Sequence, residues 1–187
     1  HEASSEIDDA VAQRGTRPIQ RVHELGLLGP SLQTIHMTQL VDKEFELLAD
    51  YGVHVAHCPE SNMKLANGIC PIDRLLKNGI NVAIGTDGAA SNNNLDMLEE
   101  TRSAALLSKV FTRDATSIDA FQALAMATIN GARLLGLEEK IGSLETGKLA
   151  DVIAVDLSGI NSQPIHNPVS QLIYTATGHQ VSHTWIN

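Results

Sequence analysis

The chain has 187 residues, of which 43% are apolar and 19% charged, a composition typical of a folded globular protein rather than a disordered one. A net charge of −9 without a basic patch argues against nucleic acid as a partner, and no apolar run is long enough to span a membrane. The two cysteines, Cys58 and Cys70, suggest no disulfide framework and fit a reducing cytoplasm. Because the sequence starts at His1, we expect it to be a piece of a longer protein.

The first part of the chain alternates between helical patterns, short apolar runs and polar loops. Two helices are expected at the start, over residues 4–13 and 17–25. Three strand–helix units are expected to follow, with strands over 32–35, 53–56 and 81–87 and helices from Asp42 to Gly52, over 71–77 and over 95–110. Strands that are linked by helices in this way run parallel with right-handed crossovers, so the sequence predicts an α/β fold.

A polar residue ends each of the three predicted strands. These residues are His36, His57 and Asp87, which lie 21 and 30 residues apart, a spacing that suits successive strand–helix units. Because the ends of parallel strands meet on one face of a sheet, we expect the three side chains to converge there. Each also has a plain structural alternative: a core or surface histidine for His36, the Cys58-Pro59 turn beside His57, and a turn-forming Asp-Gly pair for Asp87.

The part after residue 110 has a different pattern. Ser117 is expected to cap one long helix that ends at Leu135. The remaining apolar runs predict three strands without intervening helices, which we expect to form a separate small sheet: 152–155, 172–174 and 181–186.

A carboxylate and histidines that meet at the carboxyl ends of parallel strands are suited to metal-assisted hydrolysis. The residues around them resemble the amidohydrolase superfamily, in the branch of methylthioadenosine/S-adenosylhomocysteine deaminases and chlorohydrolases. The strongest motifs are residues 85–93 (GTDGAASNN) and 56–68 (AHCPESNMKLANG), and similar segments lie at 126–133 (MATINGAR) and 142–151 (GSLETGKLAD).

The resemblance implies the second half of a (β/α)8 TIM-type barrel, together with the C-terminal strands of a small β-sandwich domain. Residues 1–147 would form the half-barrel with its following helices, and residues 148–187 the strands of the β-domain. Half a barrel exposes strand edges, so the alternative is a non-catalytic half-barrel fragment that needs a partner chain.

The resemblance also assigns roles to particular residues. Asp87 matches a metal ligand, His36 the histidine that orients the attacking hydroxide, and Glu2 the acid that shuttles protons to the ring nitrogen of the substrate. Glu2, His57 and Ser91 are the expected substrate-binding residues. The family's other metal ligands, including the His-x-His pair, are absent, so this segment alone is not expected to hold the metal tightly or to turn over.

For the parent protein, the resemblance implies a deaminase that uses zinc, with iron or manganese as alternatives. The expected substrates are S-adenosylhomocysteine and 5'-methylthioadenosine, so the expected partner is a purine nucleoside. Rival reactions on the same scaffold are chlorotriazine hydrolysis and deamination of guanine or cytosine. A homo-oligomer and a cytoplasmic location are also expected.

Overall fold

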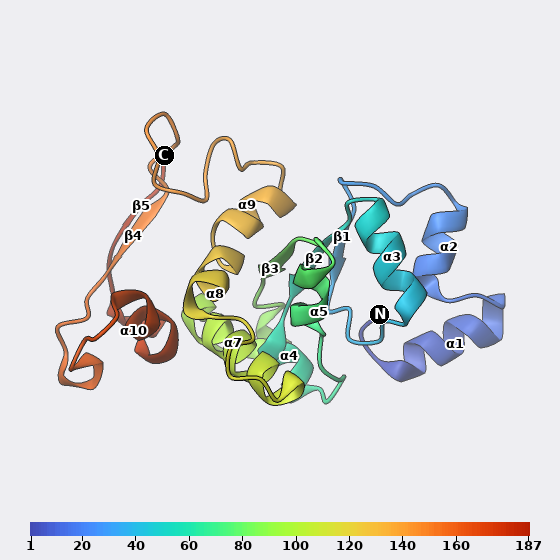
Figure 1. The fold of residues 1–187 in the computed structure, drawn as a ribbon, viewed down its shortest axis with the longest axis horizontal. Coiled ribbons are helices and arrows are strands. Elements are labelled where there is room, and N and C mark those ends of the chain that lie inside the picture. The colour runs from blue at the N-terminus through green and yellow to red at the C-terminus, as the bar shows by residue number, and fades with distance from the viewer.

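A computed structural model describes residues 1–187, and its centre is a parallel sheet of three short strands (Figure 1). The strands are β1 (Gln33–Ile35), β2 (His54–His57) and β3 (Val82–Ile84), in the order β1-β2-β3. In the register, Thr34 lies opposite Val55, and Ala56 lies opposite Ala83. The predicted parallel α/β arrangement of this part is therefore confirmed.

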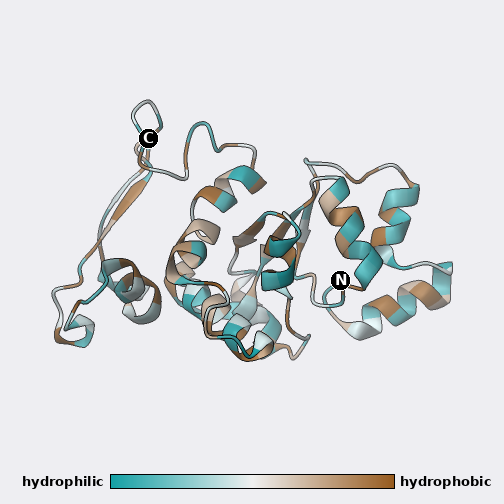
Figure 2. Cartoon of the chain, in the orientation of Figure 1, coloured by the Kyte–Doolittle hydropathy of each residue, from teal (hydrophilic) through white to brown (hydrophobic).

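Seven helices surround this sheet or connect its strands. They are α1 (Ser4–Arg14), α2 (Pro18–Glu24), α3 (Asp42–Asp50), α4 (Pro59–Lys64), α5 (Ile72–Lys77), α6 (Ala89–Asn92) and α7 (Met97–Thr112). Figure 2 shows hydrophobic and hydrophilic residues on both α1 and α3, as expected for helices with one face towards the core.

Two features of these helices were not predicted. The N-cap of α3 is Val41, and the Glu44 side chain accepts a hydrogen bond from the Val41 backbone N–H at 3.0 Å. Helices α4 and α6 have six and four residues, which is too short to leave a periodic hydrophobic pattern. Both lie next to the strand ends where the functional residues were expected.

The core lies between the sheet and its covering helices. Val55 and Val82 are fully buried on one face of the sheet, and they belong to the same apolar cluster as Leu48, Leu75 and Ala104 of the surrounding helices. Because alternate strand residues point to opposite faces, Val55 and Val82 mark the face of the sheet against which these helices pack. The neighbouring residue Ile35 on the edge strand β1 is 52% exposed.

After residue 112 the structure corrects two predictions. The expected helix from Ser117 to Leu135 is two helices, α8 (Ala120–Met126) and α9 (Ile129–Leu134), and the cap of α8 is Asp119. The expected strand over 172–174 lies inside a helix, α10 (Pro168–Thr175), which packs against α7 and α8 and buries Ile173. Residues 148–187 are therefore not purely β-structure.

The separate small sheet that was predicted contains two of its three expected strands, and these two pair antiparallel. They are β4 (Val152–Val155) and β5 (Val181–Trp185), with Ile153 opposite Thr184. Figure 1 shows this pair extending away from the parallel sheet, on the far side of α8 and α9. Two short 3-10 helices, η1 (Ile160–Ser162) and η2 (Gly178–Gln180), complete the chain, and no helix meets the length and apolarity of a membrane span.

Candidate active site

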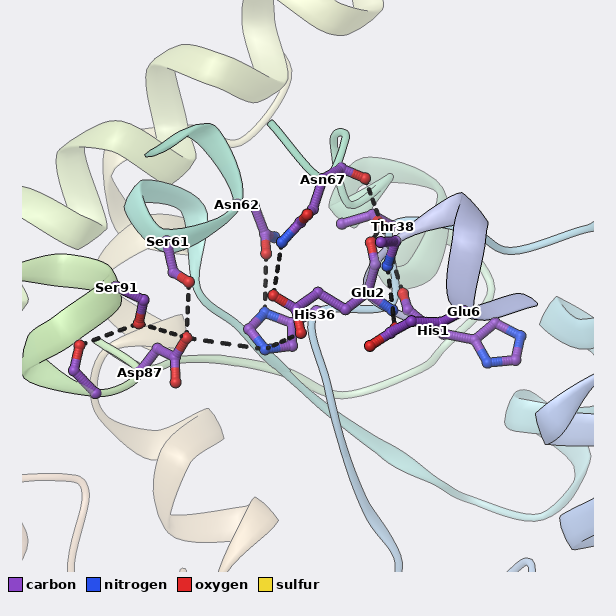
Figure 3. Close-up of polar contacts among 12 residues, drawn as sticks. His1, Glu2, Glu6, His36, Thr38, Ser61, Asn62, Asn67, Asp87 and Ser91 are labelled. Carbon is purple, nitrogen blue, oxygen red and sulfur yellow. Dashed lines mark hydrogen bonds and ion pairs between the residues drawn. The ribbon is translucent and has the colours of Figure 1, made fainter. Parts of the chain in front are cut away.

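Three of the predicted site residues, Glu2, His36 and Asp87, lie together at the carboxyl ends of the parallel strands, and we call them the polar rim (Figure 3). His36 Nε2 lies 3.6 Å from Glu2 Oε2 and 4.0 Å from Asp87 Oδ2. His36 follows β1 directly, and Asp87 lies three residues beyond the end of β3. The convergence inferred from strand spacing therefore holds for His36 and Asp87, and the chain start adds Glu2.

The backbone at the polar rim is unusual for residues that carry a side chain. His36 has a φ of 68° and Asp87 a φ of 61°, and Met37 beside His36 has a φ of 51°. Left-handed backbone at residues other than glycine costs free energy and persists where the surrounding structure enforces it, most often at functional sites. The two strand ends are thus bent so that both side chains face the same space.

Two serine hydroxyls hold the carboxylate of Asp87. Ser61 Oγ of α4 donates to Asp87 Oδ2 at 2.7 Å, and Ser91 Oγ of α6 donates to the same oxygen at 2.8 Å. These bonds, that of Ser61 first, lower the pKa of Asp87 below its ordinary value. Both serines bind Oδ2 and the side chain is 32% exposed, so the serines leave Oδ1 available for a ligand.

His36 is oriented from behind by Asn62. Asn62 Oδ1 lies 2.8 Å from His36 Nδ1, so with the amide in this orientation Nδ1 carries the hydrogen and Nε2 faces Glu2 and Asp87. A histidine fixed in this tautomer can accept a proton, or hold a water molecule, at Nε2. The imidazole is 12% exposed, which limits the space for other orientations.

Glu2 is held by both its side chain and its backbone. Asn67 Nδ2 donates to Glu2 Oε1 at 2.6 Å, and Thr38 Oγ1 donates to the Glu2 carbonyl oxygen. The neighbouring His1 points the other way, because its Nε2 lies 2.9 Å from Glu44 Oε1 and its side chain is 2% exposed. His1 is therefore not part of the polar rim.

The other two predicted residues have different surroundings. His57 is 1% exposed and lies on the same sheet face as the core residue Val55, and burial lowers the pKa of His57 to about 3. Its Nδ1 has no hydrogen-bond partner, and the substrate contact of His57 stays a prediction. Ser91 is at the rim, but its hydroxyl is bonded to Asp87 and to the Gly88 carbonyl oxygen.

Sequence reasoning missed Ser61, Asn62 and Asn67, although all three lie in the segment 56–68 that was singled out as a motif. Pro59 at the first position of α4 is the signal that a short helix starts there. Two successive polar residues in that helix, with buried side chains, contact the ends of both outer strands at once: Ser61 reaches Asp87 beyond β3, and Asn62 reaches His36 beyond β1. Their partners, however, are set by the folded arrangement and not by local sequence.

The chain's own residues do not complete a metal site. No group of three or more histidine, cysteine or acidic side chains is arranged to hold a metal ion. A catalytic zinc site takes three protein ligands and leaves one position open. Asp87, with the carboxylate oxygen that the serines leave available, fits as a single ligand.

The comparison with known proteins gives the same picture. The model of the amidohydrolase family matches residues 1–187. The chain belongs to the amidohydrolase family. It is 54% identical over 186 residues to the 5-methylthioadenosine/S-adenosylhomocysteine deaminase of Teredinibacter turnerae, a match that covers 100% of this chain and 42% of that protein. The chain therefore spans less than half the length of this relative.

Two solved structures resemble this amidohydrolase chain along its whole length. An adenosine deaminase from Xanthomonas campestris with bound zinc is 53% identical, with a TM-score of 0.97 over 100% of this chain and 42% of that one. An atrazine chlorohydrolase from Arthrobacter aurescens in complex with zinc is 28% identical, with a TM-score of 0.91 over 100% of this chain and 41% of that one. The fold is thus shared by enzymes with different substrates.

Proposed function

We propose that the protein containing this chain is a metal-dependent hydrolytic deaminase of adenine nucleoside thioethers, namely S-adenosylhomocysteine and 5'-methylthioadenosine. The observation that carries the proposal is the polar rim, where Glu2 from the chain start and Asp87 from a strand end each lie within 4.0 Å of His36. The 54% identity to a deaminase of that specificity supports the choice of substrate.

Zinc is the metal that we propose, because both solved structures described above contain it; iron and manganese are the alternatives. Asp87 would be its ligand in this chain, through the oxygen that the serines leave free. A bound zinc ion makes water a nucleophile at neutral pH. The remaining ligands would come from a preceding half of the barrel, so that this chain supplies the second half of a TIM-type barrel over residues 1–147, and β4 and β5 of residues 148–187 belong to a small β-domain.

The chain's residues would divide the proton transfers of deamination between them. Water adds to the ring carbon that bears the amino group, forming a C–O bond, and ammonia leaves as the C–N bond breaks. The Asp87 carboxylate accepts the proton released by the water, and His36 Nε2 holds the attacking oxygen in place. Glu2, at the outer side of His36, protonates the ring nitrogen, then takes the proton of the newly added hydroxyl group as the carbonyl forms and passes it to the leaving amino group. Asp87 returns its proton to Glu2 through water, which restores both groups for the next turnover.

The main rival is another hydrolysis on the same scaffold. The similarity to an atrazine chlorohydrolase favours chlorotriazine hydrolysis as the second candidate, beside the deamination of guanine or cytosine. The third candidate is a non-catalytic half-barrel that binds a partner chain, which the exposed edge residue Ile35 favours. We further propose a homo-oligomer and a cytoplasmic location for the whole protein, and we keep Ser91 as a residue at the edge of the substrate site.

The test is a comparison of substrates and of one variant in the full-length protein loaded with zinc. Ammonia release from S-adenosylhomocysteine, 5'-methylthioadenosine and guanine is measured beside chloride release from atrazine. We expect ammonia from the two thioethers, and we expect Glu2→Gln to lower kcat by about 10²–10⁴-fold because the amide cannot carry the proton. Glu24→Gln, an identical change at an exposed position of α2, is the control.

Two results would contradict the proposal. One is chloride release from atrazine without deamination of either thioether, which would favour the rival reaction. The other is an undiminished deamination rate in the Glu2→Gln variant, which would remove Glu2 from the proton pathway. A zinc-loaded protein that acts on none of these compounds would favour the non-catalytic half-barrel.

A further inference from the structure

Glu100 of α7 is a buried acid that the proposed reaction does not use. Its side chain is fully buried, and no basic residue forms an ion pair with it. Burial is the main cause that raises the pKa of Glu100 to about 7, and the negative charges of Glu60 on α4 and Asp87 on the strand-end loop act in the same direction. Burying a carboxyl group without a cation costs free energy. Its two hydrogen bonds offset part of that cost, and an apolar side chain could not form them.

One oxygen of Glu100 binds the start of α4. The Glu60 backbone N–H donates to Glu100 Oε2 at 3.2 Å, which satisfies a free donor in the first turn of this helix. The next two residues along α4 are Ser61, which donates to Asp87, and Asn62, which contacts His36. A helix of six residues has little stability of its own, so its position depends on such anchors.

The other oxygen of Glu100 binds α6. Asn92 Nδ2 donates to Glu100 Oε1, and Asn92 Oδ1 accepts the Leu95 backbone N–H at 2.6 Å, where the chain turns with a φ of 56°. Asn92 is buried and directly follows Ser91, the second serine on Asp87. Through Asn92, the same carboxylate therefore fixes the second short helix beside the polar rim.

We propose that Glu100 is a positioning residue for the polar rim: by binding α4 and α6 at once, it sets the distance between the two serines on Asp87 and aims Asn62 at His36. The effect on metal binding and turnover rests on the proposed function. The effect on the geometry around His36 does not. The carboxylate is suited to this task because both its oxygens accept hydrogen bonds, whereas an amide offers only one acceptor.

The test uses three variants of the full-length, zinc-loaded protein. In Glu100→Gln the new amide N–H faces either the Glu60 N–H or the Asn92 amide, so one of the two anchors is lost. In the double variant Asn92→Asp/Glu100→Gln, the introduced carboxylate accepts the new amide N–H, and the remaining amide oxygen still accepts the Glu60 N–H. Glu99→Gln, the same change one residue earlier on a partly exposed side chain, is the matched control.

Three quantities are measured: zinc affinity by competition with a chelating dye, kcat and KM for the deamination, and the imidazole NMR resonances of His36. We expect Glu100→Gln to weaken zinc binding and to lower kcat about tenfold each, with KM changed less, and to shift the His36 resonances. The double variant should recover most of both losses, and Glu99→Gln should stay within about twofold of wild type.

Unchanged zinc affinity, kcat and His36 resonances in the folded Glu100→Gln variant would overturn the proposal, even if its Tm fell, since the residue would then act on stability alone. Recovery of Tm without recovery of kcat and zinc affinity in the double variant would overturn it as well. If Glu100→Gln does not fold, Asn92→Ala removes only the α6 anchor and must still weaken zinc binding. If the wild-type protein deaminates nothing, the proposed function fails, but the His36 resonances still decide the role of Glu100.

Discussion

The region that ends at α7 and the region that follows it use polar residues in different ways. Before residue 110, buried polar side chains join elements that are distant in sequence, as Ser61 does with Asp87 and Asn92 with Glu100. After residue 113, most charged contacts are local and exposed, such as that of Lys148 with Glu145 at 3.4 Å. The contrast indicates that the chemistry lies in the first region and that the second contributes packing.

One residue shows how the second region still matters to the first. Asn130 of α9 is buried, and its Nδ2 donates to the Val82 carbonyl oxygen of β3 at 3.0 Å. Asn81 Nδ2 in turn donates to the Asn130 carbonyl oxygen at 2.9 Å. Since β3 is an edge strand, α9 here satisfies backbone groups that no further strand covers. The second region thus holds the strand that leads to Asp87.

The largest effect on kcat is expected when an aspartate of the first region is changed to asparagine. The same change in the second region serves as its control. Asp87→Asn removes the proton acceptor and the metal-binding charge of the polar rim, so kcat should fall by about 10²–10⁴-fold in the full-length protein. Asp156→Asn changes an exposed acid beyond β4, whose oxygen accepts the Ser158 N–H, and should leave kcat unchanged. Steady-state kinetics and zinc content are the measurements.

The regional contrast would fail if both substitutions lowered kcat to a similar extent, because the second region would then take part in the chemistry. It would also fail if Asp87→Asn retained full activity and full zinc content. Far-UV circular dichroism of both variants shows whether a loss of activity reflects a loss of fold.

The next effect concerns the packing role of the second region. Ile173 of α10 is 1% exposed and belongs to the main apolar cluster, so Ile173→Ala should lower the free energy of unfolding by about 2–5 kcal/mol. Ile160, which is 88% exposed, is the control, and Ile160→Ala should stay within about 0.5 kcal/mol of wild type. Denaturant unfolding measures both.

The expected kinetic result distinguishes packing from chemistry. At temperatures where the Ile173→Ala variant stays folded, kcat and KM should match those of wild type. A large loss of kcat with little loss of stability would mean that α10 influences the polar rim directly. A stability change as small as that of Ile160→Ala would contradict the packing of α10 against α7 and α8.

The sequence was sufficient for the alternation of strands and helices in the first region, because short segments that contain apolar residues lie between turn residues at each strand. It misled us at 172–174, because a short apolar run is compatible with both strand and helix. The deciding signal lay upstream: Asn167 caps α10 by accepting the Ser170 N–H at 2.9 Å, and Pro168 follows at the first helical position. Likewise Asp119, with Gln122 three residues later, marks the true start of α8.

The site was predictable only in part, because some of its residues act through contacts with elements that are distant in the sequence. His36 and Asp87 are read from strand ends, and Glu2 only from the family motif, because nothing before it in the chain gives it context. Ser61, Asn62 and Glu100 act through contacts between elements that are up to 40 residues apart, such as Glu60 with Glu100. No local pattern encodes such contacts, so they emerge only once the helices are packed.

The smallest effect concerns how the two serines divide their influence on Asp87. Ser61 is the larger cause of the lowered pKa of Asp87 and Ser91 the second, so Ser61→Ala should raise that pKa more than Ser91→Ala does. Ser108→Ala, which removes a buried hydroxyl bonded to Ser117, should leave it unchanged. The carboxyl ¹³C resonance of Asp87 followed against pH measures all three.

The sign of the stability change follows from the direction of the shift. A carboxyl group whose pKa is lowered by folding stabilises the protein above its unfolded pKa, and this contribution disappears as the pH falls through the folded pKa. Ser61→Ala reduces the contribution, so the stability difference between wild type and variant should be larger at pH 7 than near pH 2. If the stability difference were the same at both pH values, Ser61 would stabilise the chain through packing alone. The hydrogen bond from Ser61 would then not be a cause of the lowered pKa of Asp87.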